Sequence, residues 1–260
     1  MLSLFMVFSF LFGLTIGSFL NVVILRYNSG QAITGRSQCF SCGKILRWYE
    51  LVPILSFIAQ KGRCRGCASK ISWQYLLVEL LTGIIFALIT WEFYPNVISI
   101  IYYWVVFSLL IVILVYDWKH KIIPDKLVYP FMILSSLHWL IIEGKILSNF
   151  LSLAAGLIMF LAFGSLWYFS SGRWMGLGDA KLAFGIGALL GLFNALNSVA
   201  LSFIIGALAG LSLIAVSKLR KKFGLKHHFN LKSELPFAPF LVLGLILVLF
   251  FHIALFAFNV

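Results

Sequence analysis

The stretch VISIIYYWVVFSLLIVILVYDWKHK, residues 97–121, decides what kind of fold this chain adopts. Residues 97–116 carry no charged side chain, and an apolar run of roughly 20 residues is long enough to cross the hydrocarbon core of a bilayer as a helix. Charge returns at Asp117 and Lys119, on either side of Trp118. The stretch therefore predicts a transmembrane helix with an aspartate at one end.

The rest of the chain has the same character. Of its 260 residues, 62% are hydrophobic and 11% are charged, whereas soluble domains carry about 25% charged residues. We therefore expect an all-α polytopic membrane protein with about eight transmembrane helices. The candidate spans are residues 1–25, 75–91, 97–116, 127–142, 146–170, 181–195, 197–217 and 236–258. The short fourth run and the tightly joined sixth and seventh runs leave six or seven spans as alternatives.

The basic residues orient these helices. The net charge is +12, and eight spans with an outside N-terminus place 19 of the 20 lysines and arginines on one side, with Lys145 alone on the other. Loops rich in Lys and Arg stay in the cytoplasm, so we expect these loops to face it. They can also attract anionic lipid head groups. Membrane lipid, and no nucleic acid, is the partner expected for this charge.

Two regions differ in composition. Residues 1–95 contain the first spans and one long polar loop, 27–74, which carries all the cysteines. Residues 96–260 contain the remaining spans and all the aspartates. We expect these two regions to be the two domains of the chain.

The cysteines form two pairs of the type C-x2-C, separated by 21 residues: Cys39, Cys42, Cys64 and Cys67. This spacing is typical of a zinc site, because each pair supplies two thiolates from one tight turn. Gly43 and Gly66 suit such turns. Two disulfides or four unrelated thiols are the alternatives, and a reducing cytoplasm disfavours disulfides. The set of four sulfurs predicts a closed, structural zinc site rather than a catalytic one.

Asp117 and Asp179 are the candidate catalytic residues. Asp117 ends one predicted span and Asp179 begins another, with two spans between them, so both carboxylates return to the same membrane face. Two close carboxylates in a site of low dielectric share a proton, and such a pair can activate water and polarise an amide carbonyl. The sequence Gly-Leu-Gly before Asp179 would let an extended substrate backbone approach closely.

Simpler roles are open for each aspartate. Asp117 could end a helix and pair with Lys119 or Lys121, and Asp179 could be the N-cap of its helix. Asp125 follows Pro124, which favours a role in the first turn of a helix. The chain contains no His-Glu-x-x-His, Gly-x-Ser-x-Gly or phosphate-loop motif.

In these features the sequence resembles the type IV prepilin peptidases, membrane aspartyl proteases of the GxGD type. The similarity covers most of the chain and keeps its order. The matching segments are Gly17–Val23 with Arg26, the two cysteine pairs with Trp48, Glu50, Pro53 and Gly62-Arg63, Glu79, Asp117 with Ile123-Pro124-Asp125, Met175–Leu182, and Pro236–Phe240. The chain departs from common family residues at Tyr27, Phe40 and Ala238.

The resemblance implies a function. Such enzymes cleave the short basic leader from prepilin or pseudopilin precursors at the cytoplasmic face of the bacterial inner membrane, just after a glycine. Many also methylate the new N-terminal amine with S-adenosylmethionine. The resemblance makes Asp117 and Asp179 the catalytic pair, residues 96–260 the membrane-embedded peptidase domain, and the four cysteines the zinc ligands. It offers Glu50 and Glu79 as candidates for methylation, although Glu79 could be a polar contact between spans.

Two other classes of function compete with this one. An ion-coupled transporter with a structural zinc loop would use Asp117 and Asp179 as ion or proton sites. A non-catalytic assembly factor of a secretion or competence system would need neither acid. Replacing Asp179 by Asn distinguishes them, because it removes the acid and keeps the size of the side chain.

Overall fold

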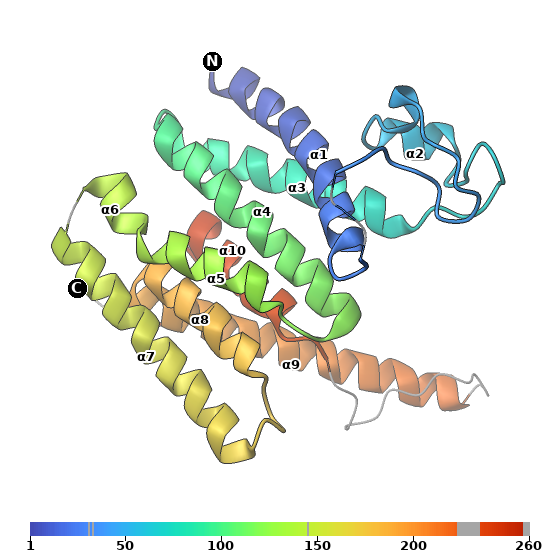
Figure 1. Ribbon diagram of the computed structural model, residues 1–260. Coiled ribbons are helices and arrows are strands. Elements are labelled where there is room, and N and C mark those ends of the chain that lie inside the picture. The colour runs from blue at the N-terminus through green and yellow to red at the C-terminus, as the bar shows by residue number, and fades with distance from the viewer. Residues whose placement is uncertain (31, 33, 145, 223–234, 257–260) are drawn as a thin grey trace. The chain divides into compact units, whose positions relative to one another are not determined.

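The computed structural model describes residues 1–30, 32, 34–144, 146–222 and 235–256 (Figure 1). These residues are mainly helical. The β-pairing within them is limited to two isolated bridges, Gln38 with Ile45 and Arg63 with Lys70. The predicted all-α fold is confirmed. The elements are α1 (Leu2–Arg26), η1 (Trp48–Glu50), α2 (Leu55–Ala59), α3 (Trp73–Phe93), α4 (Val97–His120), α5 (Asp125–Ser136), α6 (His138–Glu143), α7 (Ile146–Ser170), α8 (Leu177–Leu190), α9 (Leu192–Lys222) and α10 (Ala238–Phe251).

Within the described ranges, five helices are long and apolar enough to cross a membrane: α1, α3, α4, α7 and residues Leu192–Ser217 of α9. The other three predicted spans correspond to shorter helices. Residues 127–142 form α5 and α6, residues 181–195 are divided between α8 and α9, and residues 236–258 contain α10. The structure therefore supports a multi-pass membrane protein, and the count of eight spans stays a prediction.

Two local features divide the predicted spans. Gly191 has φ of 75° and separates α8 from α9, a backbone conformation that glycine adopts more readily than other residues. Leu137, with φ of −97° and ψ of 1°, separates α5 from α6. Hydropathy does not detect such breaks, because both segments remain apolar across them.

Some predicted features lie outside the described residues. These are Lys145, the basic residues of the segment 223–234, and the last two residues of the predicted span 236–258. The orientation inferred from basic loops rests in part on them and stays a prediction.

The chain divides into two compact units, Met1–Val112 and Ile113–Val260, and the boundary falls within α4. The predicted boundary between residues 95 and 96 stays a prediction. All four cysteines lie in the first unit, and all three aspartates lie in the second.

In the first unit α1 and α3 pack closely along their lengths (Figure 1). Gly13 and Gly17, four residues apart, form a small-xxx-small face on α1. A Cβ atom at Gly13 would lie 2.8 Å from Cα of Gly83, and one at Gly17 would lie 2.8 Å from Cα of Glu79. The two backbones therefore approach to a distance that only glycine permits at these positions.

The polar loop is tied to the ends of these helices. Arg26, the last residue of α1, donates hydrogen bonds to the carbonyl oxygens of Ala32, Thr34 and Arg36. On α3 the buried carboxylate of Glu79 accepts a hydrogen bond of 2.8 Å from the amide of Ile54, just before α2. These contacts hold the loop against the helix pair.

In the second unit α8 is the central helix and packs against α5, α7 and α9 (Figure 1). Six of its 14 residues are glycine or alanine. Gly187 approaches Gly156 of α7 so closely that a Cβ atom would lie 2.8 Å from the facing Cα. A helix buried on most sides is apolar all round. The first turn of this helix carries Asp179.

Candidate functional site

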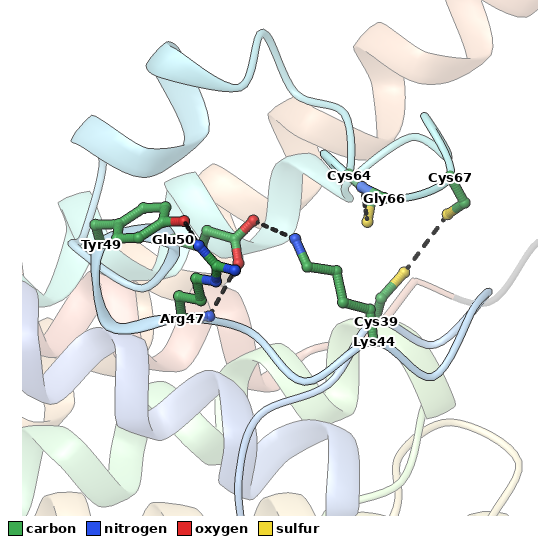
Figure 2. A network of polar contacts seen from close by, with 8 residues as sticks. All are labelled: Cys39, Lys44, Arg47, Tyr49, Glu50, Cys64, Gly66 and Cys67. Atoms are coloured by element: carbon green, nitrogen blue, oxygen red, sulfur yellow. Dashed lines mark hydrogen bonds and ion pairs between the residues drawn. The ribbon is translucent and has the colours of Figure 1, made fainter.

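The four predicted zinc ligands lie together in the first unit. The Sγ atoms of Cys39, Cys42, Cys64 and Cys67 are all within 4.8 Å of one another, and none forms a disulfide. Figure 2 shows three of these cysteines, with Cys39 Sγ 3.8 Å from Cys67 Sγ. A tetrahedral zinc site with Zn–S bonds of about 2.3 Å has its sulfurs roughly 3.8 Å apart. The cluster therefore fits a metal ion, and the four cysteines could bind one.

The two cysteine turns are structural copies of each other. In each, the amide of the first cysteine donates to the carbonyl five residues later, and its carbonyl accepts from the amide four residues later. The four bonds are each 2.9 Å long: Cys39 N to Lys44 O, Gly43 N to Cys39 O, Cys64 N to Ser69 O, and Ala68 N to Cys64 O. The same backbone pattern thus places two sulfurs on each turn.

One expectation about these turns needs correction. Gly43 has the left-handed φ of 70° that favours glycine, but the equivalent position in the second turn is Ala68, with φ of 57°. Gly66 does not have positive φ. Its amide instead donates to Cys64 Sγ at 3.3 Å, and a Cβ atom there would lie 3.1 Å from Cδ of Lys44. Gly66 therefore serves close packing rather than backbone conformation.

Backbone hydrogen bonds act on the pKa values of these thiols, and in Cys39 they favour the thiolate that binds a metal. Hydrogen bonds from the amides of Cys42 and Ser41 lower the pKa of Cys39 to about 6 and so favour its thiolate. The amide of Lys44 lowers the pKa of Cys42, but hydrogen bonding with Cys67, burial and the charge of Cys39 together raise it to about 11. Four thiolates at such short distances repel one another unless a cation lies between them.

Glu50 braces the first cysteine turn. Its carboxylate accepts hydrogen bonds of 2.9 Å from the amide of Arg47 and from Lys44 Nζ (Figure 2). The amide of Arg47, followed by Lys44, lowers the pKa of the Glu50 carboxyl. The ion pair links η1 to the residue that lies two positions after Cys42.

Asp117 lies in the second unit, three residues before the end of α4. It is 5% exposed, and its Oδ2 accepts a hydrogen bond of 3.2 Å from the amide of Ala238, the first residue of α10. The amino end of a helix favours a negative charge, so α10 is well placed to hold a carboxylate. Within the described part of the chain, Asp117 forms no ion pair with Lys119 or Lys121, and that alternative is wrong.

Asp179 is the third residue of α8. Its Oδ2 accepts a hydrogen bond of 3.1 Å from the amide of Gly176, which is the N-cap residue. The alternative that Asp179 is the N-cap is therefore wrong, although the contact is the carboxylate half of a capping box. The carboxylate of Asp117 is near enough to act electrostatically on that of Asp179. The two acids therefore interact electrostatically within the second unit, and their joint role in one site stays a prediction.

Gly178 has a different role from the one expected. A Cβ atom there would lie 2.8 Å from Cβ of Ile123, so the glycine lets the first turn of α8 pack against the segment between α4 and α5. Gly176 is exposed, and a Cβ atom there would meet no backbone atom closer than 3.9 Å. The close approach occurs within the chain itself at Gly178.

Asp125 lies in the first turn of α5, as predicted, and it has a partner that the sequence did not reveal. Lys181 Nζ pairs with Asp125 Oδ1 and also donates to the hydroxyl of Tyr129 at 3.1 Å. The Lys181 side chain is 13% exposed and that of Asp125 is 58% exposed. This ion pair joins the start of α5 to the turn of α8 that carries Asp179.

Two family models match the chain. Residues 11–93 match the family described as the bacterial peptidase A24 N-terminal domain, and residues 104–211 match the type IV leader peptidase family. No solved structure matches the chain significantly.

Curated relatives match over longer stretches. A prepilin leader peptidase/N-methyltransferase of Bacillus subtilis is 30% identical over 96% of both chains. Proteins of the same name from Vibrio cholerae and Myxococcus xanthus are 32% and 43% identical, over 68% and 50% of this chain. The chain spans 74% of the Vibrio protein and 39% of the Myxococcus protein. From these similarities, the chain belongs to the type IV leader peptidase family.

Proposed function

We propose that this protein removes the leader peptide from type IV prepilin-like precursors and methylates the new N-terminus. The names of the relatives, prepilin leader peptidase/N-methyltransferase, support both activities. The observation that supports the peptidase assignment is the electrostatic interaction between the carboxylates of Asp117 and Asp179. No similarity supports the transporter or the assembly factor.

The proposed cleavage uses one shared proton. Each acid accepts a hydrogen bond from a backbone amide at the amino end of a helix, Asp117 from Ala238 and Asp179 from Gly176. Two neighbouring carboxylates do not readily both ionise, so the pair holds one proton. The ionised member takes a proton from water while the protonated member polarises the scissile carbonyl.

We place this site at the cytoplasmic face of the bacterial inner membrane. The loop 27–74, which carries many basic residues, supports this orientation under the positive-inside rule. Asp117 follows a long apolar run of α4, so it lies near a membrane boundary. The family's precursors have a basic leader followed by an apolar helix, which would rest at the same boundary.

The four cysteines are proposed to bind a structural zinc ion. Four thiolates complete a tetrahedral shell and leave no position for water, as in closed structural sites. When bound, the ion would neutralise the crowded sulfurs and cross-link the two turns. Loss of zinc is therefore expected to loosen the loop 27–74 while the aspartates of the second unit keep their hydrogen bonds.

Replacing Asp179 by Asn tests the peptidase assignment. The purified variant is incubated with a prepilin, and the new N-terminus is located by mass spectrometry. We expect cleavage to fall by at least a hundredfold, because the amide cannot take part in proton transfer. Asp125→Asn is the matched control, since it makes the same change at an aspartate of the same unit.

The control should keep most of its cleavage activity, because its largely exposed ion pair contributes at most about 1 kcal/mol. Retained cleavage by the Asp179→Asn variant would reject the catalytic role of Asp179. Equal losses in both variants would show that the effect is not specific to the proposed pair.

A further inference from the structure

Two contacts fix the start of α8 to the segment that follows α4, and they lie on either side of Asp179 in the sequence. Before the acid, Gly178 packs against Ile123 so closely that an added Cβ atom would lie 2.8 Å from Cβ of Ile123. After the acid, Lys181 pairs through its Nζ atom with Oδ1 of Asp125, the first residue of α5. The turn of α8 that carries Asp179 is thus held on both sides by one short stretch of the second unit.

Lys181 makes the second contact with two residues of α5. Besides pairing with Asp125, its ammonium donates to the hydroxyl of Tyr129 at 3.1 Å and lies 4.7 Å from the centre of the Tyr129 ring. Asp125 and Tyr129 are four residues apart, so they lie on one face of α5. The Lys181 side chain is only 13% exposed, and a charge that is largely removed from water requires such partners.

The same stretch of chain leads directly from the other acid. Asp117 lies in the last turn of α4, which ends at His120, and α5 begins at Asp125. The four connecting residues, 121–124, span at most roughly 14 Å when fully extended, so the start of α5 stays near the end of α4. Through α5, Lys181 therefore links the turn that carries Asp179 to the end of the helix that carries Asp117.

We propose that Lys181 is a positioning residue for cleavage, which sets the separation of the Asp117 and Asp179 carboxylates by binding α5. This inference rests on the proposed peptidase activity, and it gives Lys181 no contact with the substrate. Two acids share a proton only when their carboxylates lie close together. A displacement of about 1 Å can lower a rate roughly a hundredfold, so a contact that adds little stability can still control cleavage.

Lys181, rather than Asp125, is the residue on which this contact depends. An asparagine at position 125 keeps an oxygen that can accept a hydrogen bond from Lys181, and Tyr129 stays in place. Asp125→Asn therefore remains a suitable control for Asp179→Asn. Replacing Lys181 removes the contacts with both residues of α5 at once.

Three variants test the assignment. Lys181→Met keeps an unbranched side chain but removes the ammonium, whereas Lys181→Arg keeps a cation that can pair with a carboxylate and stack on a ring. Lys126→Met is the matched control, because it makes the same change at an exposed lysine next to Asp125. The kcat and KM of prepilin cleavage are measured across pH for each full-length protein in detergent, together with its unfolding temperature.

We expect Lys181→Met to lower kcat about tenfold and to leave KM within about twofold of the wild type, because it disturbs the acids rather than substrate binding. Lys181→Arg should recover most of this loss, and Lys126→Met should cleave like the wild type. Equal losses in Lys181→Met and Lys126→Met would overturn the proposal, since the effect would then follow from lost charge alone.

The pH profile distinguishes positioning from a loss of folded protein. Burial, followed by the charge of Asp117, raises the pKa of Asp179 to about 7. If the first turn of α8 moves away from Asp117 into solvent, both causes weaken and the pKa of Asp179 falls. The alkaline limb of the profile should therefore move to lower pH in Lys181→Met. Losing the positive charge of Lys181 would by itself move it to higher pH, and a smaller folded fraction would not move it at all.

An alkaline limb that stays in place or moves to higher pH in Lys181→Met would overturn the positioning role. If that variant does not fold, Tyr129→Phe replaces it, because only the hydroxyl is lost. Tyr129→Phe should give a smaller shift in the same direction, and an unshifted profile would then overturn the proposal. A wild-type protein that fails to cleave would instead reject the peptidase assignment, which unaltered cleavage by Lys181→Met would leave standing.

Discussion

Ala68 and Gly43 occupy the same position in two matching cysteine turns, yet one of them carries a side chain. Both have positive φ, 57° for Ala68 and 70° for Gly43. A residue other than glycine in the left-handed region typically costs about 1 kcal/mol or more. The second turn therefore holds its two sulfurs with a strained backbone that the first turn avoids.

Replacing Ala68 by Gly is expected to strengthen the metal centre. The change removes the backbone strain, so the variant should release zinc to a chelator more slowly than the wild type. Gly43→Ala is the reciprocal variant, because a Cβ atom there would meet nothing within 4 Å and only the φ penalty applies. It should release zinc faster, and slower release from Gly43→Ala would contradict the explanation.

Glu50 makes the stability of the loop depend on pH. The amide of Arg47 and then Lys44 lower its pKa in the folded state, whereas an unfolded glutamate titrates near about 4.3. Its stabilising contribution is therefore present above about pH 4.3 and is lost as the pH falls through the lowered folded-state pKa. Protonation of Glu50 therefore lowers the stability of the folded loop at acidic pH.

Glu50→Gln tests this linkage by removing the titration. The difference in thermal unfolding between the wild type and the variant, followed by tryptophan fluorescence, should be largest at neutral pH and shrink below about pH 4. Comparing the two proteins at each pH cancels the protonation of the cysteines, which both share. A difference that stays constant down to pH 3 would refute the assigned role.

Residue types and spacing predicted the cysteine cluster. They did not predict hydrogen-bond or ion-pair partners that lie far away in the sequence. Two C-x2-C pairs need only a turn each, and such turns are local. The contact between Asp117 and the Ala238 amide joins residues 121 positions apart, and that between Lys181 and Asp125 joins residues 56 positions apart. Nothing local to Asp117 marks a backbone amide as its partner.

At the scale of elements, hydropathy located the apolar helices and missed where they break. The runs 1–25 and 146–170 coincide closely with α1 and α7. Gly191 was a visible signal for the end of α8, because glycine commonly follows a helix end. The break at Leu137 has no comparable signal, since leucine is a good helix former.

The contact between α1 and α3 predicts that a Gly→Ala change within it lowers the stability of the protein, whereas the same change at an open position does not. At Gly17 the added Cβ atom would lie 2.8 Å from the backbone of Glu79, so the helices must separate, at a cost of roughly 1–3 kcal/mol. Gly164→Ala in α7 is the matched control, because nothing lies within 4 Å of its added atom. The unfolding temperature measured in detergent should fall for Gly17→Ala and stay unchanged for Gly164→Ala.

The expected loss at Gly17 is specific to the helix contact. If Gly17→Ala and Gly164→Ala unfold at the same temperature, the close packing of α1 on α3 does not contribute to stability. The Gly17 variant should also bind zinc normally, because the cysteines lie on the loop rather than on either helix.

At the scale of the molecule, the proposed metal site and the proposed peptidase site belong to different compact units. The first contains the cysteine cluster, and the second contains Asp117 and Asp179. Family membership follows from the sequence because the motifs occur in order along the chain. The packing of the loop on α1 and α3 does not, because the contacts of Arg26 and Glu79 with the loop depend on the fold.

Removing the metal tests this division. Treatment with a strong chelator should abolish zinc content and loosen the loop 27–74, because the metal would cross-link its two cysteine turns, and methylation should fall with it. Prepilin cleavage should stay within about threefold of the untreated protein, since no cysteine lies in the second unit. A parallel loss of cleavage and methylation would show that the units do not act separately.

The contact of Asp117 with Ala238 also determines when, during synthesis of the chain, the proposed site can be completed. Asp117 is synthesised 121 residues before its partner, because the amide that holds it belongs to α10, the last helix of the described residues. A partly made copy therefore already contains both aspartates and still lacks the group that orients one of them. Under the proposed mechanism, the enzyme is inactive while it is being inserted and becomes able to cleave only after α10 has been made.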